Sequence, residues 1–421
     1  MIWKSIWRYQ TIRFGESLGD LKVRSQNCLN HYPDFTVPTG KRRIDSMDMN
    51  YDYLYADALS FRKPDMISRG ALPGPMAFMP DDLRVPQAYK ILPDGTVAFC
   101  LHYPNAHSVH LKIYGDEEFE LTLTGRDGLW TGSCRPGTGL LGVVVSIDGN
   151  EVLSPALPIA YSANMPMNLI EVPEENSVIF PTSCPHGSVV TEYFESRVSG
   201  KMERIYVYLP PDYHHSDRKY PVLYLQHGHG ENETGWVTQG RVNFVADNLI
   251  SSGKASAAII VMCCGMMTFE EDEGTRLAYS EGFPRMLLDE IIPYIENRFR
   301  VYSDAEHRAI AGLSMGSIQT SIITLNHPEL FRYTGLFSGF VQDPLAGYSN
   351  HLTPQKLAAY KDRFKVYFRG IGDQDPYMPN FLSDDDLLTE YGIKCERHIY
   401  RGGHLWKVWQ HCFHDFYQLL F

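Results

Sequence analysis

Short stretches of alternating apolar and polar residues, separated by turn residues, fill the chain from about residue 91 to residue 172. Such alternation is clearest in residues 97–101, 109–114 and 141–147, and the pairs Asp94-Gly95 and Asp127-Gly128 interrupt the pattern. Alternation with a period of two indicates strands that bury one face, and Asp-Gly pairs favour tight turns between strands. The pattern therefore predicts a small all-β, immunoglobulin-like sandwich over residues 71–173.

After residue 173 the pattern changes to fully apolar runs that alternate with helical periodicity. Residues 221–225 and 257–262 are almost wholly apolar, as expected for strands that are buried on both faces of a parallel sheet. Residues 243–250 and 283–299 instead repeat their apolar positions with helical spacing. This alternation predicts a three-layer α/β/α domain over residues 174–421.

The first 70 residues show little periodicity, and we treat residues 1–70 as an N-terminal extension of uncertain structure. Residues 1–14 mix Lys and Arg with Trp and Ile and contain neither a continuous apolar core nor a small-residue cleavage site, so they do not resemble a signal peptide. We also find no apolar run of roughly 18 residues, the length that spans a bilayer. The expectation is a cytoplasmic protein, or a secreted one if the true start lies elsewhere.

Composition narrows the classes of partner. The 421 residues are 44% hydrophobic and 21% charged, with a formal net charge of −12 and with both signs interspersed. This distribution argues against nucleic acid and anionic membranes as partners and favours a neutral or weakly charged small-molecule or oligosaccharide substrate. The eight cysteines are scattered without a C-x-x-C pair, and we interpret them as free thiols. We expect no cofactor and no metal, and a homo-oligomer is left open.

The strongest chemical signal is the pentapeptide Gly312–Gly316, which reads G-x-S-x-G. An apolar run precedes it and a helix-like run follows it, so the serine falls at a sharp turn between a strand and a helix. This context predicts a nucleophile elbow, in which the two glycines allow the backbone to turn and leave the Ser314 hydroxyl exposed.

A serine nucleophile needs a base and an orienting carboxylate, which in this fold class follow in the order Ser, Asp, His. His404 follows an apolar strand and the pair Gly402-Gly403, and we take it as the base. Between Ser314 and His404, residues 364–372 predict a strand that ends in carboxylates. Asp373 is the preferred orienter and Asp375 the reserve. The backbone N–H of Met315, directly after the nucleophile, is the expected first oxyanion donor.

Several segments together resemble the feruloyl-esterase and esterase-D branch of the α/β-hydrolases. They are residues 208–213, 225–228, 246–250, 292–296, 308–316, 402–404 and 408–409. The preceding stretch, residues 93–172, is similar to the early-set domains of bacterial esterases and glycogen-branching enzymes. The resemblance implies a serine esterase and places the second oxyanion donor at the N–H of His229. It also marks Ser317 as a departure, because the family usually has glycine there, and modest crowding of helix against strand is expected.

The substrate is less well defined by the sequence. Trp236, Tyr377, Trp406 and Trp409 are candidate substrate-binding residues, although core packing explains each equally well. The working hypothesis is a hydroxycinnamoyl (feruloyl) ester of plant cell-wall carbohydrate. The alternatives are an acetylated carbohydrate, an enterochelin-type siderophore ester, or a non-catalytic carbohydrate-binding protein. By resemblance to sugar-binding early-set domains, Trp130 is a candidate stacking platform.

Two further patterns favour ordinary structural roles. The pair His227-x-His229 and the residues His411, Cys412, His414 and Asp415 include metal-ligating side chains, but neither set supplies a convincing ligand spacing. Residues 384–386, three aspartates after Ser383, are interpreted as the start of a helix, where acidic residues interact favourably with the helix dipole.

Overall fold

The strands between residues 89 and 172 form two antiparallel sheets. The computed structural model describes residues 88–115, 118–126, 128–162, 164–174, 178–179, 181–266, 268–271, 274–277, 282–342 and 352–421, so the extension predicted at residues 1–70 lies outside the described residues. The first sheet has the order β1 (Tyr89–Ile91), β2 (Val97–His102), β6 (Leu129–Cys134) and β5 (Thr124–Arg126). The second has the order β4 (Glu118–Thr122), β3 (Val109–Tyr114), β7 (Gly139–Ile147), β10 (Met165–Val172) and β9 (Ile159–Ser162), with β8 (Asn150–Val152) paired to β7.

Burial in strands β2 and β3 follows the predicted period of two. In β2, Val97, Phe99 and Leu101 are buried, while the residues between them are only partly covered. The alternation confirms the all-β class of this region. The indole N–H of Trp130 donates to the carbonyl of Tyr103 at 3.0 Å, and sugar binding by this tryptophan stays a prediction.

The remaining large sheet is mostly parallel. Its order is β11 (Ser188–Glu195), β12 (Met202–Leu209), β14 (Ile259–Cys263), β13 (Val222–Gln226), β17 (Arg308–Leu313), β18 (Tyr333–Phe337), β19 (Val366–Gly372) and β20 (Glu396–Tyr400). Strands β11 and β12 are antiparallel to their neighbours, whereas the strands from β14 to β20 pair in parallel. The carboxyl ends of the parallel strands therefore meet at one edge of the sheet, where α/β proteins bind their ligands.

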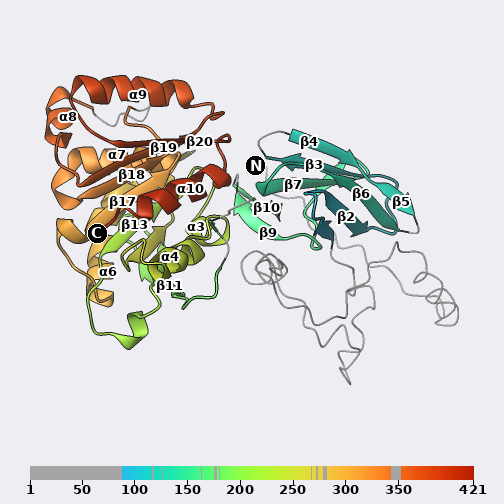
Figure 1. Cartoon of the computed structure of the whole chain (residues 1–421), viewed down its shortest axis with the longest axis horizontal. Helices are drawn as coiled ribbons and strands as arrows, with labels where there is room; N and C mark the ends of the chain where they lie inside the picture. The colour runs from blue at the N-terminus through green and yellow to red at the C-terminus, as the bar shows by residue number, and fades with distance from the viewer. Residues whose placement is uncertain are drawn as a thin grey trace. The chain divides into compact units, whose positions relative to one another are not determined.

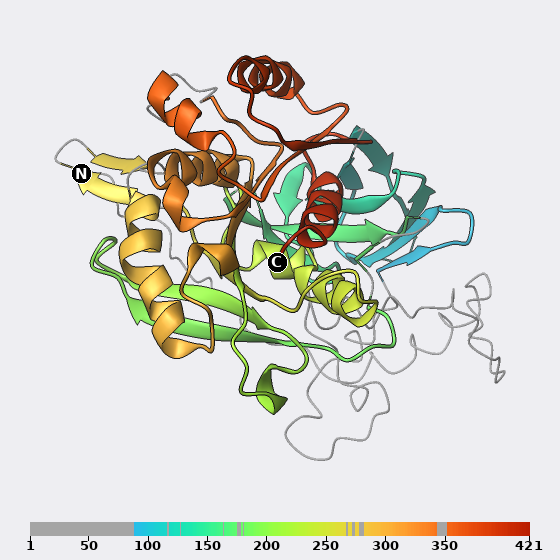
Figure 2. The ribbon, with the colours of Figure 1, turned by 60° about the vertical axis from the view of Figure 1, so that its left-hand side comes forward.

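Helices cover both faces of this sheet (Figures 1 and 2). One face packs against α10 (Trp406–Tyr417), whose Phe416 contacts Phe337 and Phe368 of the strands, and α4 (Val242–Ser251) lies against α10. The other face packs against α6 (Ile292–Arg298), α7 (Met315–Asn326), α8 (Pro354–Tyr360) and α9 (Met378–Glu390). The predicted three-layer α/β/α class is thus confirmed. Within the described ranges, no helix is both long enough and apolar enough to cross a bilayer.

Shorter elements complete the chain. They are α3 (Gly235–Thr238), α5 (Gly282–Met286), η3 (Tyr213–His215), η5 (Ala305–His307), η6 (Pro328–Leu330) and the hairpin of β15 (Thr268–Glu271) with β16 (Gly274–Leu277). The cysteines that the structure describes all have free thiols.

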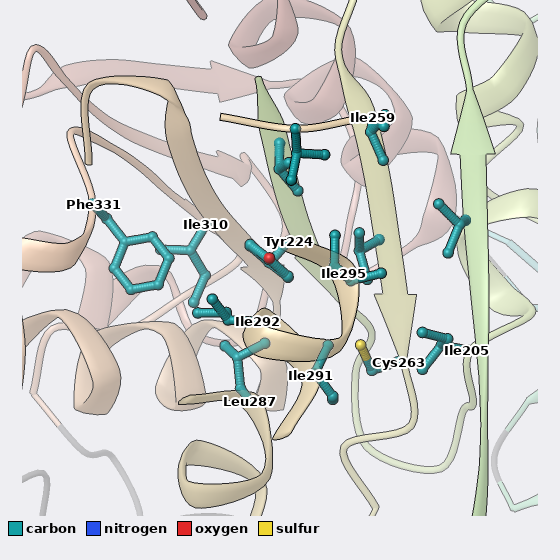
Figure 3. Packing of buried hydrophobic residues seen from close by; sticks show 14 of the residues in the cluster. Ile205, Tyr224, Ile259, Cys263, Leu287, Ile291, Ile292, Ile295, Ile310 and Phe331 are labelled. Carbon is teal, nitrogen blue, oxygen red and sulfur yellow. The ribbon is translucent and has the colours of Figure 1, made fainter. Parts of the chain in front are cut away.

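A buried hydrophobic cluster joins the sheet to the helical segment at residues 282–298. Figure 3 shows Tyr224 and Ile310 of the strands facing Ile291, Ile292 and Ile295. The sequence predicts one helix here, and the structure interrupts it with a π-helical segment, η4 (Leu287–Ile291), between α5 and α6. Pro293 has no N–H and cannot continue a regular α-helical ladder, which agrees with a wider turn at this point.

The aspartates at 384–386 do not begin a helix. Helix α9 starts at Met378, so these residues lie in its interior and the predicted N-cap is wrong. Asp384 is buried and accepts hydrogen bonds from the backbone N–H groups of Val341 (2.7 Å) and Gln342 (3.1 Å). The acidic run thus holds the loop after β18, a role that depends on tertiary contacts.

A buried ion pair links strand β10 of the sandwich to the start of α4. Nη2 of Arg241 lies 3.1 Å from Oε2 of Glu171, and the two side chains are only 2% and 3% exposed. All described residues belong to one compact unit that spans Tyr51–Phe421, and this pair is part of its interior.

We expect Glu171→Gln to lower the free energy of unfolding by about 3–5 kcal/mol, because it removes one charge of a buried ion pair while the Arg241 charge stays buried. The matched control is Glu118→Gln, which breaks the exposed pair between Lys112 Nζ and Glu118 Oε1 (2.6 Å) and should cost less than about 1 kcal/mol. Denaturant unfolding measures both. Equal losses in the two variants would contradict a dominant role for the buried pair.

Candidate active site

The candidate site lies at the carboxyl ends of neighbouring parallel strands. The segment 227–231 follows β13, Ser314 follows β17, Ser338 follows β18, Asp375 lies just beyond β19, and His404 lies just beyond β20. Residues far apart in the sequence meet here because adjacent parallel strands end at the same edge.

Ser314 occupies a backbone conformation that side-chain-bearing residues rarely adopt. Its φ is 49° and its ψ is −116°, directly between β17 and α7. A Cβ atom at Gly312 would clash with the backbone of Gly316, and one at Gly316 would lie 2.5 Å from the carbonyl oxygen of His227. Both glycines of the pentapeptide are therefore required by close backbone approach, which agrees with a nucleophile elbow.

Ser317 fits without the expected crowding. Its side chain is buried against Gly339, where any Cβ would collide with it. The Ser317 hydroxyl donates to the Ser314 carbonyl at 2.5 Å and accepts from the N–H of Phe340 at 3.2 Å. The missing glycine on the helix is thus compensated by a glycine on the neighbouring loop.

Three side chains form a continuous hydrogen-bonded series. Oγ of Ser314 lies 2.9 Å from Nε2 of His404, and Nδ1 of His404 lies 2.8 Å from Oδ2 of Asp375. The imidazole is 23% exposed, while the Asp375 carboxylate is fully buried. A buried carboxylate on one ring nitrogen and a hydroxyl on the other is the arrangement that activates a serine.

The preference for Asp373 over Asp375 is corrected by the structure. The Asp373 N–H donates to the carbonyl of Tyr400 (2.7 Å), and its Oδ1 accepts from the N–H of Gly402 (2.9 Å). Asp373 therefore holds the loop that contains His404. The chain turns after Asp373, and it is the carboxylate of Asp375 that contacts the imidazole. Both aspartates follow the same strand, so their spacing alone does not separate the two roles.

Asp375 stays ionised because hydrogen bonding outweighs its burial. Burial alone raises the pKa of this carboxyl, but hydrogen bonds from His404, from the Ser338 hydroxyl and from the N–H of Tyr377 bring the pKa below its usual value. Ser338 in turn accepts from the indole N–H of Trp409 at 3.0 Å. The sequence analysis missed Ser338; the only available signal was a small polar residue at the carboxyl end of an apolar strand.

The residues expected to form the oxyanion hole border the same site. Met315 is the first residue of α7, and His229 lines the cavity that also contains Ser314 and His404. A Cβ at Gly228 would lie 3.5 Å from Cβ of Ser314, so the loop passes close to the serine. The donor roles of the Met315 and His229 N–H groups stay predictions.

His227 is a buried, neutral histidine. Its Nε2 accepts from the N–H of Gly265 at 3.0 Å, so the ring proton is on Nδ1, which donates to the Gly228 carbonyl at 2.7 Å. Burial lowers the pKa of His227 to about 4. Across the described part of the chain, no cluster of three or more His, Cys, Asp or Glu side chains is placed to hold a metal ion.

A cavity of about 250 Å³ opens beside Ser314. Trp406 and Trp409 line it, as the sequence analysis expected. Trp236 does not: it is 1% exposed, its indole N–H donates to the Gln226 carbonyl at 3.0 Å, and its prediction as a substrate-binding residue is wrong. Tyr377 packs against the His404 ring at a centroid distance of 5.2 Å and is not part of the cavity wall.

Residues of the sandwich also line the cavity, namely Tyr114, Leu140, Gly142, Ser162, Met167 and Leu169. The buried side chain of Glu231, on the loop after β13, also borders this cavity. Sequence reasoning singled out none of these residues, because no local pattern shows which sandwich positions face a distant loop.

The fold and the elbow define an α/β-hydrolase, and a family model described as "Putative esterase" matches residues 196–418. The chain belongs to this esterase family. Membership confirms the predicted resemblance to esterases.

Relatives by sequence and neighbours by fold are found among known proteins. The chain is 31% identical over 357 residues to an endo-1,4-beta-xylanase/feruloyl esterase of Xylanibacter ruminicola. The aligned region covers 82% of this chain and 47% of the relative, so the chain spans about half the length of that protein. Its fold is similar to a ferulic acid esterase of Anaeromyces mucronatus (TM-score 0.51, 21% identity, 58% of this chain and 95% of that chain). The fold is also similar to that of the enterobactin esterase of Shigella flexneri (TM-score 0.57, 14% identity, 79% of this chain and 96% of that chain).

We expect Asp375→Asn to lower kcat for a simple ester on the order of 10³–10⁴-fold, because an amide neither stabilises the imidazolium nor enforces the correct tautomer. Asp373→Asn keeps an oxygen acceptor for the Gly402 N–H and should stay within about tenfold of the wild type. Measuring kcat of both variants by steady-state kinetics shows which aspartate orients His404. A larger loss in Asp373→Asn would restore the original assignment.

His227 predicts a defined pH dependence of stability. Because its folded pKa of about 4 is below the ordinary value of 6.5, the unfolded state binds more protons between these values and stability falls as the pH falls through this window. From pH 7.5 to pH 4, the difference in unfolding free energy between wild type and His227→Gln should shrink by about 3 kcal/mol. A constant wild-type-to-His227→Gln difference across this pH range would refute the assignment.

Proposed function

We propose that Ser314, His404 and Asp375 form a catalytic triad that hydrolyses a carboxylic ester through an acyl-enzyme. Nε2 of His404 takes the proton of the Ser314 hydroxyl as its oxygen attacks the ester carbonyl, and returns that proton to the leaving alcohol. A water molecule then repeats the cycle and releases the acid. The observation that supports this most directly is the series of 2.9 Å and 2.8 Å contacts from Ser314 through His404 to Asp375.

The tetrahedral intermediate needs donors for its developing negative charge. We assign this role to the backbone N–H groups of Met315 and His229. Met315 supports the assignment because it begins α7, where free N–H groups and the helix dipole favour an anion. In this reading, the exposed imidazole of His229 has no part in the chemistry.

The proposed substrate is a hydroxycinnamoyl ester, such as a feruloyl group on plant cell-wall carbohydrate. Two observations support it. The Xylanibacter ruminicola relative is named as a xylanase and feruloyl esterase, and the cavity beside Ser314 has walls of Trp406, Trp409 and Met167, which suit a flat apolar acyl group.

The nucleophile is tested with p-nitrophenyl acetate. Ser314→Ala should lose at least about a thousandfold in kcat, because the acyl-enzyme cannot form. Ser321→Ala is the matched control, since it removes another buried hydroxyl of α7, one that donates to the Phe340 carbonyl at 2.6 Å, and it should hydrolyse the ester at close to the wild-type rate. Equal rates for Ser314→Ala and wild type would refute the proposed mechanism.

The acyl group is tested with a panel of methyl ferulate, acetylated xylan and an enterobactin-like trilactone. We expect kcat/KM to be highest for methyl ferulate, because its planar ring is conjugated with the scissile carbonyl and can lie flat against the two tryptophans. A higher kcat/KM for acetylated xylan or for the trilactone would replace the feruloyl assignment with the corresponding alternative and leave the triad mechanism intact.

A further inference from the structure

The loop that contains the proposed oxyanion donor is held from outside its own domain. We call residues 228–231 the oxyanion loop; within it, the N–H of Glu231 donates to the Gly228 carbonyl at 3.4 Å. The carbonyl of Gly230 instead accepts from the N–H of Asn164 at 2.8 Å. Asn164 lies between strands β9 and β10, and its φ of 65° is part of the turn.

A second contact joins the same hairpin to the same loop. The hydroxyl of Ser162, the last residue of β9, donates to Oε1 of Glu231 at 3.4 Å. Just beyond the loop, Nε2 of Gln239 donates to the carbonyl of Tyr161, also in β9, at 3.2 Å. The β9–β10 hairpin therefore touches the oxyanion loop through both backbone and side chain.

Glu231 extends this connection to the histidine side of the site. The indole N–H of Trp406 donates to Oε1 of Glu231 at 2.8 Å. Trp406 packs edge-on against Trp409 at 5.3 Å, and Trp409 packs edge-on against the His404 ring at 5.1 Å. One buried carboxyl thus lies between the oxyanion loop, the hairpin and the aromatic residues that support the base.

The surroundings of Glu231 suit a neutral carboxyl group. Both hydrogen bonds go to Oε1, while Oε2 is buried without a hydrogen-bond partner. An ionised carboxylate would be costly there, and burial raises the pKa of Glu231 to about 8. A glutamine can make the same two hydrogen bonds through its amide oxygen.

We propose that the β9–β10 hairpin of the sandwich and Glu231 position the oxyanion loop against the triad, with Glu231 as the positioning residue. The proposal rests on the proposed function of Ser314 and deepens it. It gives the sandwich a part in turnover that does not depend on sugar binding. Small displacements of an oxyanion donor reduce rate far more than substrate affinity, because the donor acts on charge that develops in the transition state.

The test compares Glu231→Ala with Glu231→Gln on p-nitrophenyl acetate. We expect Glu231→Ala to lower kcat about 10- to 100-fold with KM changed less than about threefold. Glu231→Gln should keep kcat within about threefold of wild type, because it restores both hydrogen bonds. Ser162→Ala and Trp406→Phe, which each remove one donor to Glu231, should lower kcat by intermediate amounts and provide the test if Glu231→Ala does not fold.

A transition-state readout separates positioning from general destabilisation. Phenylboronic acid forms a tetrahedral adduct with a nucleophilic serine, so its inhibition constant should weaken in the variants in proportion to kcat/KM. The control is Tyr103→Phe, which removes the hydrogen bond from the Tyr103 hydroxyl to Ser154 (2.7 Å) inside the sandwich and should leave kcat and boronate inhibition unchanged.

Three results would overturn the positioning role: unchanged kcat in Glu231→Ala, equal loss in Glu231→Ala and Glu231→Gln, or the same loss in Tyr103→Phe. Failure of the proposed function has a different signature. If Ser314→Ala were as active as wild type, the triad and the positioning role would fall together. If Ser314-dependent hydrolysis of p-nitrophenyl acetate occurred without hydrolysis of methyl ferulate, only the feruloyl assignment would fail.

Discussion

The candidate site depends on one backbone constraint, the positive φ of Ser314 between β17 and α7. A non-glycine residue in such a conformation is disfavoured by on the order of 1–3 kcal/mol and persists only where its surroundings enforce it. Here the surroundings are close-packed backbone: Gly312 and Gly316 leave no room for side chains, and the Ser314 N–H donates to the carbonyl of Phe337 at 2.9 Å. The constraint places the hydroxyl above the sheet edge, within hydrogen-bond distance of His404.

The parallel sheet supplies the rest of the arrangement. Strands β18, β19 and β20 end beside the elbow and are followed by Ser338, Asp375 and His404, whose side chains form one hydrogen-bonded series that reaches Ser314. The indole of Trp409, from helix α10, extends this series by donating to Ser338. Because each member is held by the next, the imidazole has a fixed orientation. Asp373 adds to this by anchoring the loop at Gly402.

The balance between burial and hydrogen bonding sets which ionisable groups around the site are charged and which are neutral. Asp375 is buried but receives several hydrogen bonds, which hold its pKa low and keep it charged. In His227 and Glu231 burial outweighs the hydrogen bonds to each side chain and favours the neutral forms. Neutral His227 and Glu231 hydrogen-bond to backbone and aromatic neighbours, whereas charged Asp375 hydrogen-bonds to the imidazole of His404. Because burial favours the neutral form of Glu231, this residue can connect the sandwich to the oxyanion loop without a neighbouring cation.

The sequence by itself determined the two fold classes, the turn at Ser314 and the choice of His404 as candidate base, because alternation, helical spacing and glycine-rich turns are local properties of a chain. Tertiary structure alone decided between Asp373 and Asp375, placed Trp236 in the core, put the aspartates 384–386 inside α9, and revealed Ser338 and Glu231. The physical reason is common to these cases. The direction of a side chain after a strand depends on the curvature of the loop and on residues that are distant in the sequence. Asp375 meets His404 across 29 residues, and Glu231 contacts Ser162 and Trp406 across 69 and 175 residues.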